Sequence, residues 1–482
     1  MSRSVSIALG LALLAVTASA QNDTYCGGSL QPNMYNTFDF TYNHGGNFTV
    51  VTMIGPTSNE TSLLYCGDAP IGTQALLEAG VNTNVQQFKV PVTSVATSGN
   101  FTSSYVELIG QGNSIMYMDD PQLVVSPCLQ QRYANKTLQA LNDTQYQTQF
   151  NNISAAFLMT TQPAENKAVY VPESLEVDPL QRVEYIKAIS LFYDLGAEGQ
   201  SVYNKIRNNY GTLQNAVASI PADQQKRIGW VEYDFSVSAW RIRNSVFTRA
   251  IIKDAGGISF PLRGDGVADR SILDITDLQT MIRNSWVVID QTNFNGQNAN
   301  QGDFNLWRTL AGVTMDELPG KRVYSLSGTS NAQGVSDYDY RAPARPDLLL
   351  QDLIHAQYPS FNVSWTFLDP GFIYGSGPDH VMTAAMCGQA VYNDAPITVY
   401  AGGTFSGDGT VSPPLVGSGI YGAASGGSSG SKSKTPIIVA VVVVAAVIGA
   451  GFAFAFFKWG KRAKEDRFIE LEEEMNNEIP LH

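Results

Sequence analysis

The chain has 482 residues, of which 44% are hydrophobic and 15% are charged, and its formal net charge is −13. This composition is typical of a large globular protein with a conventional core, organised as one or two domains. The excess of acidic residues argues against a nucleic acid as the partner.

Residues 1–20 have the pattern of a secretory signal peptide. Arg3 precedes an apolar run over residues 7–16, and the small residues Ala18-Ser19-Ala20 come directly before Gln21. A basic start, an apolar stretch and a small-residue cleavage site together define such a signal. We therefore expect the mature chain to begin at Gln21.

Cysteines and glycosylation sequons both fit an extracellular segment after residue 20. Four cysteines in such a segment favour two disulfides over a metal site. Three pairings are possible, and we favour Cys66 with Cys128 and Cys26 with Cys387, although the sequence alone does not decide. Eight N-x-[ST] sequons predict N-linked glycans, seven of them before residue 153. The sequons begin at Asn22, Asn47, Asn59, Asn100, Asn135, Asn142, Asn152 and Asn362.

Residues 21–178 are expected to form an N-terminal α/β lobe. Strands are predicted at 48–54, 62–66, 88–96 and 115–118, and a short helix at 103–109. Strand, polar turn, helix and strand follow each other as in a parallel sheet, whose ligands bind at the carboxyl ends of the strands. The polar loop Ser98–Thr102 is therefore a candidate site. Alternatively, it is an ordinary connection that a glycan on Asn100 would crowd.

Residues 179–220 are expected to form two linking helices separated by Leu195-Gly196. Apolar side chains recur every three or four residues, which is the period of one helix face. In the first helix these are Val183, Ile186, Ile189 and Tyr193, and in the second Val202, Ile206, Tyr210, Leu213 and Val217. The second helix, 197–220, would be roughly 36 Å long, enough to join two lobes. Two ordinary helices in one core are the alternative.

Residues 221–365 repeat the α/β architecture without repeating the sequence. Strands are predicted at 227–233, 286–290 and 322–326. Helices are predicted at 239–255, closed by two glycines, and from Pro346 to about Gln357. The buried face of this last helix would consist of Leu349, Leu350, Leu353 and Ile354.

The C-terminal region predicts a membrane anchor. An irregular extension, 366–401, leads into a Gly/Ser-rich stretch, 402–434, that would form a flexible stalk. Residues 437–457 are apolar and long enough to cross a bilayer as a helix. Basic residues follow at once, which places the tail 458–482 in the cytoplasm. We expect a single-pass type I protein of the plasma membrane or a secretory-pathway membrane. A buried soluble helix is the alternative.

Several of these segments together resemble the class III periplasmic substrate-binding proteins. The resemblance lies in VATSGNFTSSYVELIG, RVEYIKAISLFYDLGAEGQSVYNKIRNNYGTL, RIGWVEYDFSVSAWRIRNSVFTRAIIKDAGG and RPDLLLQDLIHAQYP. Members of this family deliver ferric siderophores, haem, cobalamin or metals to ABC importers. LLYCGDAP, SPC and RPDLLLQDL are similar to the family's membrane-anchored eukaryotic relatives. The resemblance implies two Rossmann-like lobes joined by a long helix, with the ligand held between them.

The resemblance also implies which residues touch the ligand. They are Ser98, Asn100, Phe101 and Thr102 in the first lobe, and Tyr233, Trp240, Arg241, Tyr338, Tyr340 and Arg341 in the second. Aromatic rings would bury a bulky chelate, while arginines would hold its carboxylate or hydroxamate oxygens. Packing is the alternative for each of them. Trp240 would then pack at the start of its helix, and Tyr338 and Tyr340 would cap the interface between the lobes.

A bare transition metal is a less favoured ligand than a chelate. The only histidines are His44, His355, His380 and His482, and none lies in a candidate loop. His355 is expected to be structural, on the last helix. A ferric site built from Tyr338 and Tyr340 is a weaker alternative. We expect no tightly bound cofactor, and a ferric chelate as the ligand.

Three functions remain open on the sequence. The first is a surface receptor that takes up a siderophore-like solute, with a tail that binds a cytoplasmic sorting partner or is merely solvated. The second is a surface hydrolase, although the GxGxxG and GxSxG patterns at 417–422 and 426–430 lie in the stalk and lack the required strand and helix. The third is a structural or adhesive glycoprotein with a vestigial cleft. We expect that the protein is not an enzyme.

Overall fold

The computed structural model describes most of the chain between residues 30 and 412. These residues lie in the first of two compact units, 1–423 and 424–482. The predicted signal peptide, membrane span and tail fall outside the described residues. None of the helices that are described is both long and apolar enough to cross a bilayer. The described residues are 30, 38–42, 48–54, 59–98, 100–142, 145–158, 167–171, 178–260, 269–292, 303–318, 320, 322–361, 363–374, 380–389, 404–406 and 410–412.

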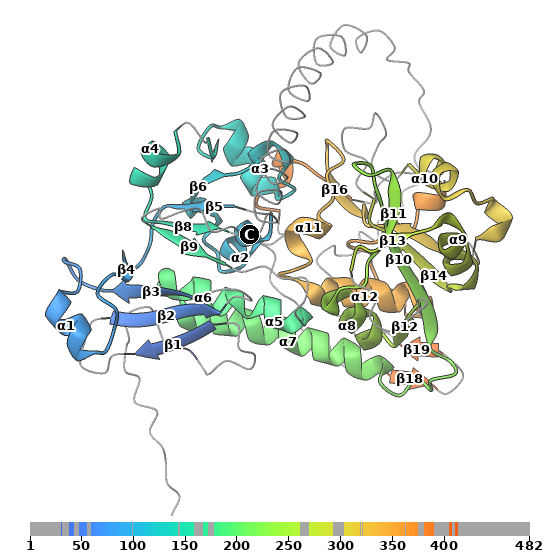
Figure 1. Ribbon diagram of the computed structural model, residues 1–482, viewed down its shortest axis with the longest axis horizontal. Helices are drawn as coiled ribbons and strands as arrows, with labels where there is room; N and C mark the ends of the chain where they lie inside the picture. The colour runs from blue at the N-terminus through green and yellow to red at the C-terminus, as the bar shows by residue number, and fades with distance from the viewer. Residues whose placement is uncertain are drawn as a thin grey trace, which may run out of the picture. The chain divides into compact units, whose positions relative to one another are not determined.

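The N-lobe, which we define as the described residues up to 171, contains two sheets (Figure 1). The first has the order β1-β2-β3-β4, with β3 and β4 parallel and the other pairs antiparallel. Its elements are β1 (Phe38–Tyr42), β2 (Phe48–Ile54), β3 (Asn59–Tyr65), β4 (Gln86–Lys89) and the helix α1 (Thr73–Glu78). The sequence predicted β2 and β3 but not that they form a sheet of their own.

The second sheet of the N-lobe is parallel throughout, as the strand–helix–strand order predicts. Its strand order is β7-β6-β5-β8-β9. The strands are β5 (Val95–Thr97), β6 (Ile115–Met118), β7 (Gln139–Ala140), β8 (Ala155–Leu158) and β9 (Ala168–Tyr170). The helical segments are α2 (Asn100–Leu108), η1 (Gly112–Ser114), η2 (Pro121–Leu123), α3 (Pro127–Ala134) and α4 (Tyr146–Asn151).

The single strand expected at 88–96 is wrong. The chain leaves the first sheet after Lys89 and enters the second at Val95. Pro91, which follows a cis peptide bond, lies at the crossing. Because proline has no N–H to donate to a ladder, it commonly ends a strand. The apolar run 88–96 thus contributes its first residues to the first sheet and its last residues to the second.

Three helices link the lobes where the sequence predicts two. They are α5 (Pro179–Val183), α6 (Tyr185–Phe192) and α7 (Gly196–Val217). The predicted apolar positions are buried, but α6 is buried on every side and not on one face alone. All five residues of the predicted α7 stripe, from Val202 to Val217, are buried. The N-terminal part of this stripe packs in the N-lobe core and the C-terminal part in the core of the second lobe. Helix α7 therefore belongs to both hydrophobic cores.

Gly199 allows α6 and α7 to pack closely. A Cβ atom at this position would lie 2.1 Å from the Ser190 hydroxyl oxygen. We expect Gly199→Ala to destabilise the fold by about 1–3 kcal/mol, because the helices must separate. A Cβ atom at Gly211, on the same helix, would meet no other atom within 4 Å. The control Gly211→Ala should raise stability by about 0.5–1 kcal/mol. Urea unfolding compares the two; equal effects would contradict close packing at Gly199.

The C-lobe, which we define as described residues 226–361, is built on a mostly parallel sheet. The strand order is β13-β11-β10-β14-β15, and β12 pairs with β10. The strands are β10 (Lys226–Asp234), β11 (Ala239–Ile242), β12 (Gly257–Ser259), β13 (Ile272–Leu273), β14 (Val287–Asp290) and β15 (Val323–Ser325). The helical segments are α8 (Val246–Asp254), α9 (Ile275–Asn284), α10 (Phe304–Ala311), η3 (Met315–Glu317), α11 (Tyr338–Arg341) and α12 (Pro346–Gln357).

Two predictions about C-lobe helices meet different outcomes. Helix α12 has the predicted bounds, and all of its residues are buried, not only the predicted leucines and Ile354. The helix expected over 239–255 is wrong at its start. Residues Ala239–Ile242 form β11, antiparallel to β10, and α8 begins only after Ser245, whose hydroxyl accepts the Thr248 N–H. An N-cap serine satisfies a free backbone donor, which fixes the start of the helix there.

The extension after residue 365 contains a segment that joins the lobes. We call residues 380–389 the strap; it contains β17 (His380–Met382) and η6 (Ala384–Met386) and follows η5 (Phe372–Tyr374). Strand β17 pairs in parallel with β16 (Thr329–Asn331) of the C-lobe. Its Met382 is buried in the N-lobe core, and the Met382 carbonyl accepts a hydrogen bond from Gln130 at 3.2 Å.

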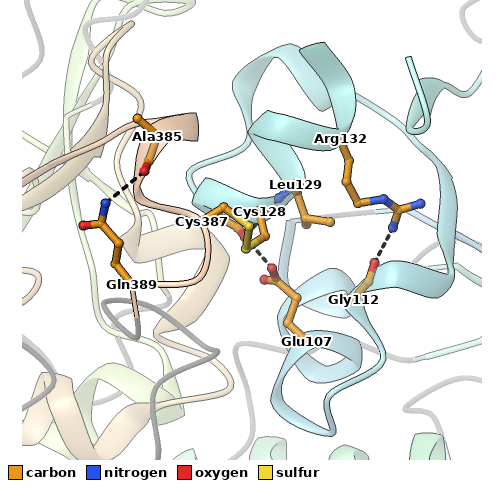
Figure 2. The surroundings of a disulfide bond; sticks show 9 residues. Glu107, Gly112, Cys128, Leu129, Arg132, Ala385, Cys387 and Gln389 are labelled. Carbon is orange, nitrogen blue, oxygen red and sulfur yellow. Dashed lines mark hydrogen bonds between the residues drawn. A yellow bond between two sulfur atoms is a disulfide. The ribbon is translucent and has the colours of Figure 1, made fainter. Parts of the chain in front are cut away.

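A disulfide fixes the strap to the N-lobe. Figure 2 shows the bond between Cys128 at the start of α3 and Cys387 at the end of η6, residues 259 positions apart. The expected pairings are therefore wrong, because neither Cys66–Cys128 nor Cys26–Cys387 can form alongside it. Cys66 is disulfide-bonded too. Cys387 bonds to Cys128 because β17 pairs with β16, which places η6 and the following Cys387 against α3.

Two regions bear on the remaining sequence predictions. The hairpin of β18 (Thr404–Ser406) and β19 (Thr410–Ser412) lies within the expected stalk and contacts α7. Four predicted glycosylation sites are exposed on the N-lobe, namely Asn59, Asn135, Asn142 and Asn152. Asn22, Asn47 and Asn362 lie outside the described residues, as does the side chain of Asn100. Glycosylation stays a prediction.

Candidate ligand-binding site

The predicted N-lobe site lies where β5 ends and α2 begins. The Ser98 N–H donates to the Phe157 carbonyl at 2.9 Å, and the Ser98 carbonyl accepts the Thr102 hydroxyl at 2.8 Å. Thr102 is fully buried, and the Phe101 ring packs edge-on against Tyr105 in the core. The Ser98 side chain is half-buried. Of the described side chains in this loop, Ser98 is thus the one that reaches solvent.

The N-lobe and the C-lobe contact each other next to this loop. Helix α2 packs against α11, and Figure 1 shows the two helices facing each other. The Asn331 side-chain amide donates to the carbonyls of Leu123 and Val124, at 3.1 and 3.3 Å. We call the region where α2 and residues 119–125 of the N-lobe meet residues 331–341 of the C-lobe the seam. It lies at the carboxyl ends of β5 and β6, where α/β sheets bind ligands.

The structure separates the three predicted site residues on α11. Tyr340 is 3% exposed and packs in the N-lobe core with Phe101 and Val124. Tyr338 packs in the C-lobe core near Trp230 and Phe367. Arg341 is fully buried and pairs with Asp337 at 2.5 Å. Phe101 and Tyr340 therefore lie in one hydrophobic core, whereas Tyr338 and Arg341 are buried elsewhere in the C-lobe.

Trp240 and Tyr233 form a cross-strand pair on β10 and β11. Their ring centroids lie 5.3 Å apart, and Phe235 packs edge-on against Tyr233 at 5.0 Å. Trp240 is 4% exposed, and its indole N–H donates to the Leu310 carbonyl at 3.2 Å. Tyr233 is only half-buried. Tyr233 therefore offers accessible aromatic surface, whereas Trp240 supports it from the core.

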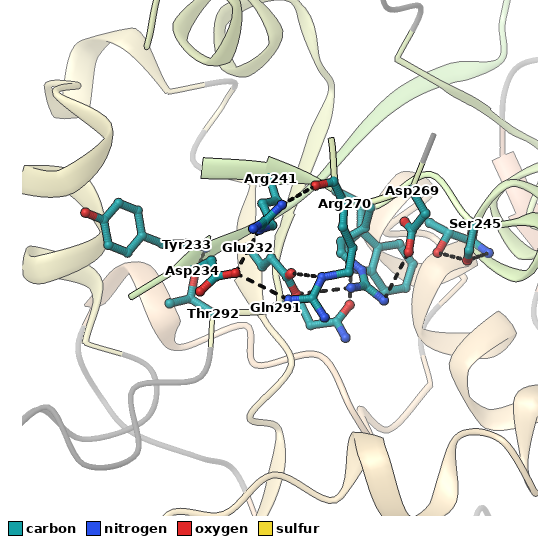
Figure 3. Close-up of polar contacts among 12 residues, drawn as sticks. Glu232, Tyr233, Asp234, Arg241, Ser245, Asp269, Arg270, Gln291 and Thr292 are labelled. Carbon is teal, nitrogen blue, oxygen red and sulfur yellow. Dashed lines mark hydrogen bonds and ion pairs between the residues drawn. The ribbon is translucent and has the colours of Figure 1, made fainter. Parts of the chain in front are cut away.

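Arg241 belongs to a charge network that Figure 3 shows at the carboxyl end of β10. Arg241 contacts Asp234 at 2.8 Å, and Arg270 contacts Glu232 at 2.9 Å and Asp234 at 3.5 Å. The third arginine, Arg243, lies 3.2 Å from Glu232 and 3.6 Å from Asp269. Each arginine thus already has a carboxylate partner. Only Arg241 was predicted from the sequence.

Several acidic residues near the seam were not predicted. Asp119 and Asp120 follow β6 directly and are exposed, as is Asp339 on α11. The surface of Asp339 is exposed, but protein atoms around its carboxyl remove part of its hydration. This desolvation raises the pKa of the Asp339 carboxyl. Arg243 opposes that pKa shift and Glu232 adds to it. Asp119 and Asp120 could have been identified from the sequence, because they directly follow a predicted parallel strand.

Asp290, at the carboxyl end of β14, is 1% exposed. Burial raises the pKa of its carboxyl to about 7 from an ordinary value of 3.8, although the Thr292 hydroxyl and N–H donate to it. The folded protein therefore keeps a proton between about pH 4 and pH 7 that the unfolded chain releases. The stability that this proton contributes is complete below about pH 4 and is lost as the pH rises through 7.

We expect Asp290→Asn to remove this pH dependence. Between pH 5 and pH 8, the free energy of unfolding of the wild type should fall by roughly 2–4 kcal/mol relative to the variant. Urea unfolding of both proteins at the two pH values measures this difference. A constant difference would contradict a buried protonated carboxyl.

A metal centre finds no support in the described part of the chain. Within it, no group of three or more His, Cys, Asp or Glu residues is arranged to hold a metal ion. His355 is 9% exposed and stacks on Trp365 with centroids 4.1 Å apart. Burial lowers the pKa of His355 to about 4. These contacts agree with the structural role expected for His355.

Comparison with known proteins gives likenesses of fold. No family model matches the chain, and neither does any curated protein. A possible iron-binding, periplasmic solute-binding protein from Staphylococcus epidermidis is 11% identical, with a TM-score of 0.42 over 56% of this chain and 99% of that one. The periplasmic vitamin B12-binding protein BtuF of Vibrio cholerae is 12% identical, with a TM-score of 0.37 over 55% and 97%.

A third solved structure is CeuE of Helicobacter pylori in a nickel–histidine complex. It is 10% identical, with a TM-score of 0.43 over 64% of this chain and 89% of that one. Similarity to these solved binding proteins is thus found at the level of a mixed α/β fold alone. At these values the likeness carries no argument about the ligand or the site.

Proposed function

We propose that the protein is a membrane-anchored receptor that captures a small solute between its lobes for uptake, and that this solute is a ferric siderophore or a related chelate. The seam is the observation that carries the proposal. There, α2, which begins directly after β5, packs against α11 of the other lobe. Binding at the carboxyl ends of parallel strands is the general rule for such sheets.

Accessible groups in both lobes fit a bulky, partly polar solute. Tyr233 presents aromatic surface, and Arg270, which pairs with Glu232 and Asp234 on the opposite side of β10, has a side chain that is 52% exposed. Flat rings and a few well-placed polar groups are typical of small-molecule sites. Ser98 adds a hydroxyl from the N-lobe. The proposal gives contact roles to Ser98, Tyr233 and Arg241, and supporting roles to Phe101, Trp240, Tyr338, Tyr340 and Arg341.

Native mass spectrometry of the full-length protein, purified from its own source, tests this function. We expect a co-purified small molecule or iron, and a saturable thermal shift when that molecule is added back. Tyr233→Ala should weaken binding about tenfold or more, since a buried aromatic contact is lost. Tyr374→Ala, at a 73% exposed tyrosine of η5, is the matched control. No bound species and no thermal shift would contradict the proposal.

Uptake is a separate part of the proposal and has its own test. Deleting residues 461–482 should abolish accumulation of the solute in cells while binding is retained. Unchanged accumulation would remove the sorting role of the tail.

One observation favours a second candidate, a structural or adhesive glycoprotein. Phe101 and Tyr340, which a ligand would have to reach, are both buried in the N-lobe core. In that case the seam is an ordinary interface, and no solute shifts the melting temperature. The thermal-shift experiment therefore separates the two candidates.

A further inference from the structure

The amino-terminal edge of the C-lobe sheet carries basic side chains that have no acidic partner. Lys226 and Arg227 begin β10, and Arg322 directly precedes β15. Within the described part of the chain, none of the three forms an ion pair. At the opposite edge, by contrast, each arginine of the charge network contacts a carboxylate. Uncompensated positive charge is therefore concentrated at one edge of a chain whose formal net charge is −13.

Trp286 lies between two of these cations. The Lys226 ammonium nitrogen is 4.7 Å from the centroid of its ring, and the central carbon of the Arg322 guanidinium is 3.9 Å from it. The Trp286 indole N–H donates to the Gln357 carbonyl at 3.3 Å, which holds the ring in place. Trp286 is nevertheless 41% exposed. One Nη atom of Arg322 is enclosed and has no acceptor among the described residues. The edge thus presents a fixed aromatic ring between two unpaired cations.

The sheet register extends this surface to β12. The Trp286 N–H donates to the Arg227 carbonyl at 2.8 Å, so the two residues are neighbours at the start of their strands. Arg227 pairs in parallel with Ile258, and side chains of paired residues stand on the same face of a sheet. Arg227 is exposed and Ile258 is 39% exposed. We call this surface the basic edge; it consists of Lys226, Arg227, Ile258, Trp286 and Arg322.

The basic edge lies at the end of the C-lobe from which the chain continues toward the predicted membrane span. A Cβ atom at Gly256, directly before β12, would lie 3.0 Å from side-chain atoms of Val217 and Ile220, so the end of α7 packs against β12. The β18–β19 hairpin contacts α7, and Figure 1 shows this hairpin beside β12. Residues 413–436 connect the hairpin to the span. A covalent tether of this kind raises the effective concentration of the bilayer for a weak contact.

We propose that the basic edge docks on the phospholipid headgroups of the bilayer that holds the proposed anchor. Tryptophan, lysine and arginine are the side chains typical of the headgroup layer, where the cations bind phosphate oxygens and the ring meets the apolar boundary. Because the chain as a whole is acidic, an anionic surface repels it unless a basic region meets that surface. The inference rests on the membrane anchor of the proposed function.

Docking through this edge leaves the candidate ligand-binding site accessible. Tyr233 lies near the other end of β10, roughly 23 Å from Lys226 at about 3.3 Å per residue. The proposal therefore adds an orientation to the receptor, in which the carboxyl ends of the C-lobe strands are directed away from the bilayer.

Tryptophan quenching in vesicles tests the docking on the full-length protein. The protein is reconstituted in phosphatidylcholine vesicles in which some lipids bear a nitroxide on the headgroup, which quenches nearby indole rings. We expect Trp286→Phe to lose a quenched component that the wild type has. Trp459, next to the predicted span, contributes equally to both proteins, so the difference reports Trp286. Phosphatidylglycerol should enlarge this difference and high salt should reduce it.

Charge-neutralising substitutions assign the docking to the basic edge. In vesicles that contain phosphatidylglycerol, Lys226→Gln and Arg227→Gln should each lower the ratio of docked to undocked protein about fivefold. Lys136→Gln removes the same charge from an exposed position of the N-lobe and is the matched control. Melting temperatures verify that each variant is folded.

The outcomes separate this inference from the proposed function. Equal quenching in the wild type and Trp286→Phe, or docking that survives both Lys226→Gln and Arg227→Gln, overturns the inference and leaves solute binding untouched. If alkaline carbonate extracts the protein from the vesicles, the proposed anchor fails instead. Sedimentation with added phosphatidylglycerol vesicles then decides about the edge: binding that Arg227→Gln weakens supports it, and no binding overturns it.

Discussion

Replacing both Cys128 and Cys387 by serine is expected to lower the free energy of unfolding by about 2–5 kcal/mol. The bond closes a loop between residues 259 positions apart, so the reduced chain gains many unfolded conformations. It also fixes the strap, whose Met382 fills part of the N-lobe core. The double variant avoids leaving one free thiol.

Denaturant unfolding of the oxidised wild type and the double variant measures this effect. Peptide mapping without reductant verifies the pairing in the wild type. Ser126→Ala, next to Cys128, removes the hydroxyl that caps α3 and bonds to Glu107. This control should cost only about 0.5–2 kcal/mol. A double variant no less stable than this control would show that the non-covalent contacts of the strap, its β16–β17 pairing and the burial of Met382, are enough to hold it.

Arg341→Met is expected to destabilise the protein by about 3–5 kcal/mol without any ligand present. The guanidinium and its Asp337 partner are both fully buried, and Arg341 also lies over the Phe367 ring. Removing one partner leaves a buried carboxylate that keeps its desolvation cost but loses its counter-charge. Arg345, which pairs with Asp347, is a second buried arginine of the same lobe.

The double variant Asp337→Leu, Arg341→Met provides the control. Since it removes both charges, most of the stability lost in the single variant should return. Equilibrium unfolding in urea is the measurement. Wild-type stability in Arg341→Met, combined with weaker solute binding, would instead assign Arg341 to the ligand, as the family resemblance implies.

The regular parts of the fold could be predicted because their signals are local. The α7 stripe from Val202 to Val217 repeats every three to four residues, and Pro346 marks the start of α12. Burial of one helix face is enough to fix such elements. The β11 strand was missed although Ser245, a good N-cap, was a signal for a later helix start.

The strap and the cysteine pairing could not be predicted. Strand β17 has three residues, and its pairing with β16 depends on tertiary contacts, which leave no periodic pattern. The candidate site was predicted in part. Ser98 and Tyr233 are accessible, whereas the neutralised arginines became clear only with the structure. For Arg341 a local signal existed, because Asp337 lies four residues earlier, the spacing of an ion pair on one helix face.

The Cys128–Cys387 bond also determines how the protein responds to proteolysis. A single cut anywhere between the two cysteines leaves both fragments covalently joined, so they separate in electrophoresis only after reduction. Nicking in this interval therefore releases no part of the N-lobe from the anchor that we propose. After a single cut in this interval, shedding into the medium requires a reductant as well, whereas a cut between Cys387 and the proposed anchor needs none.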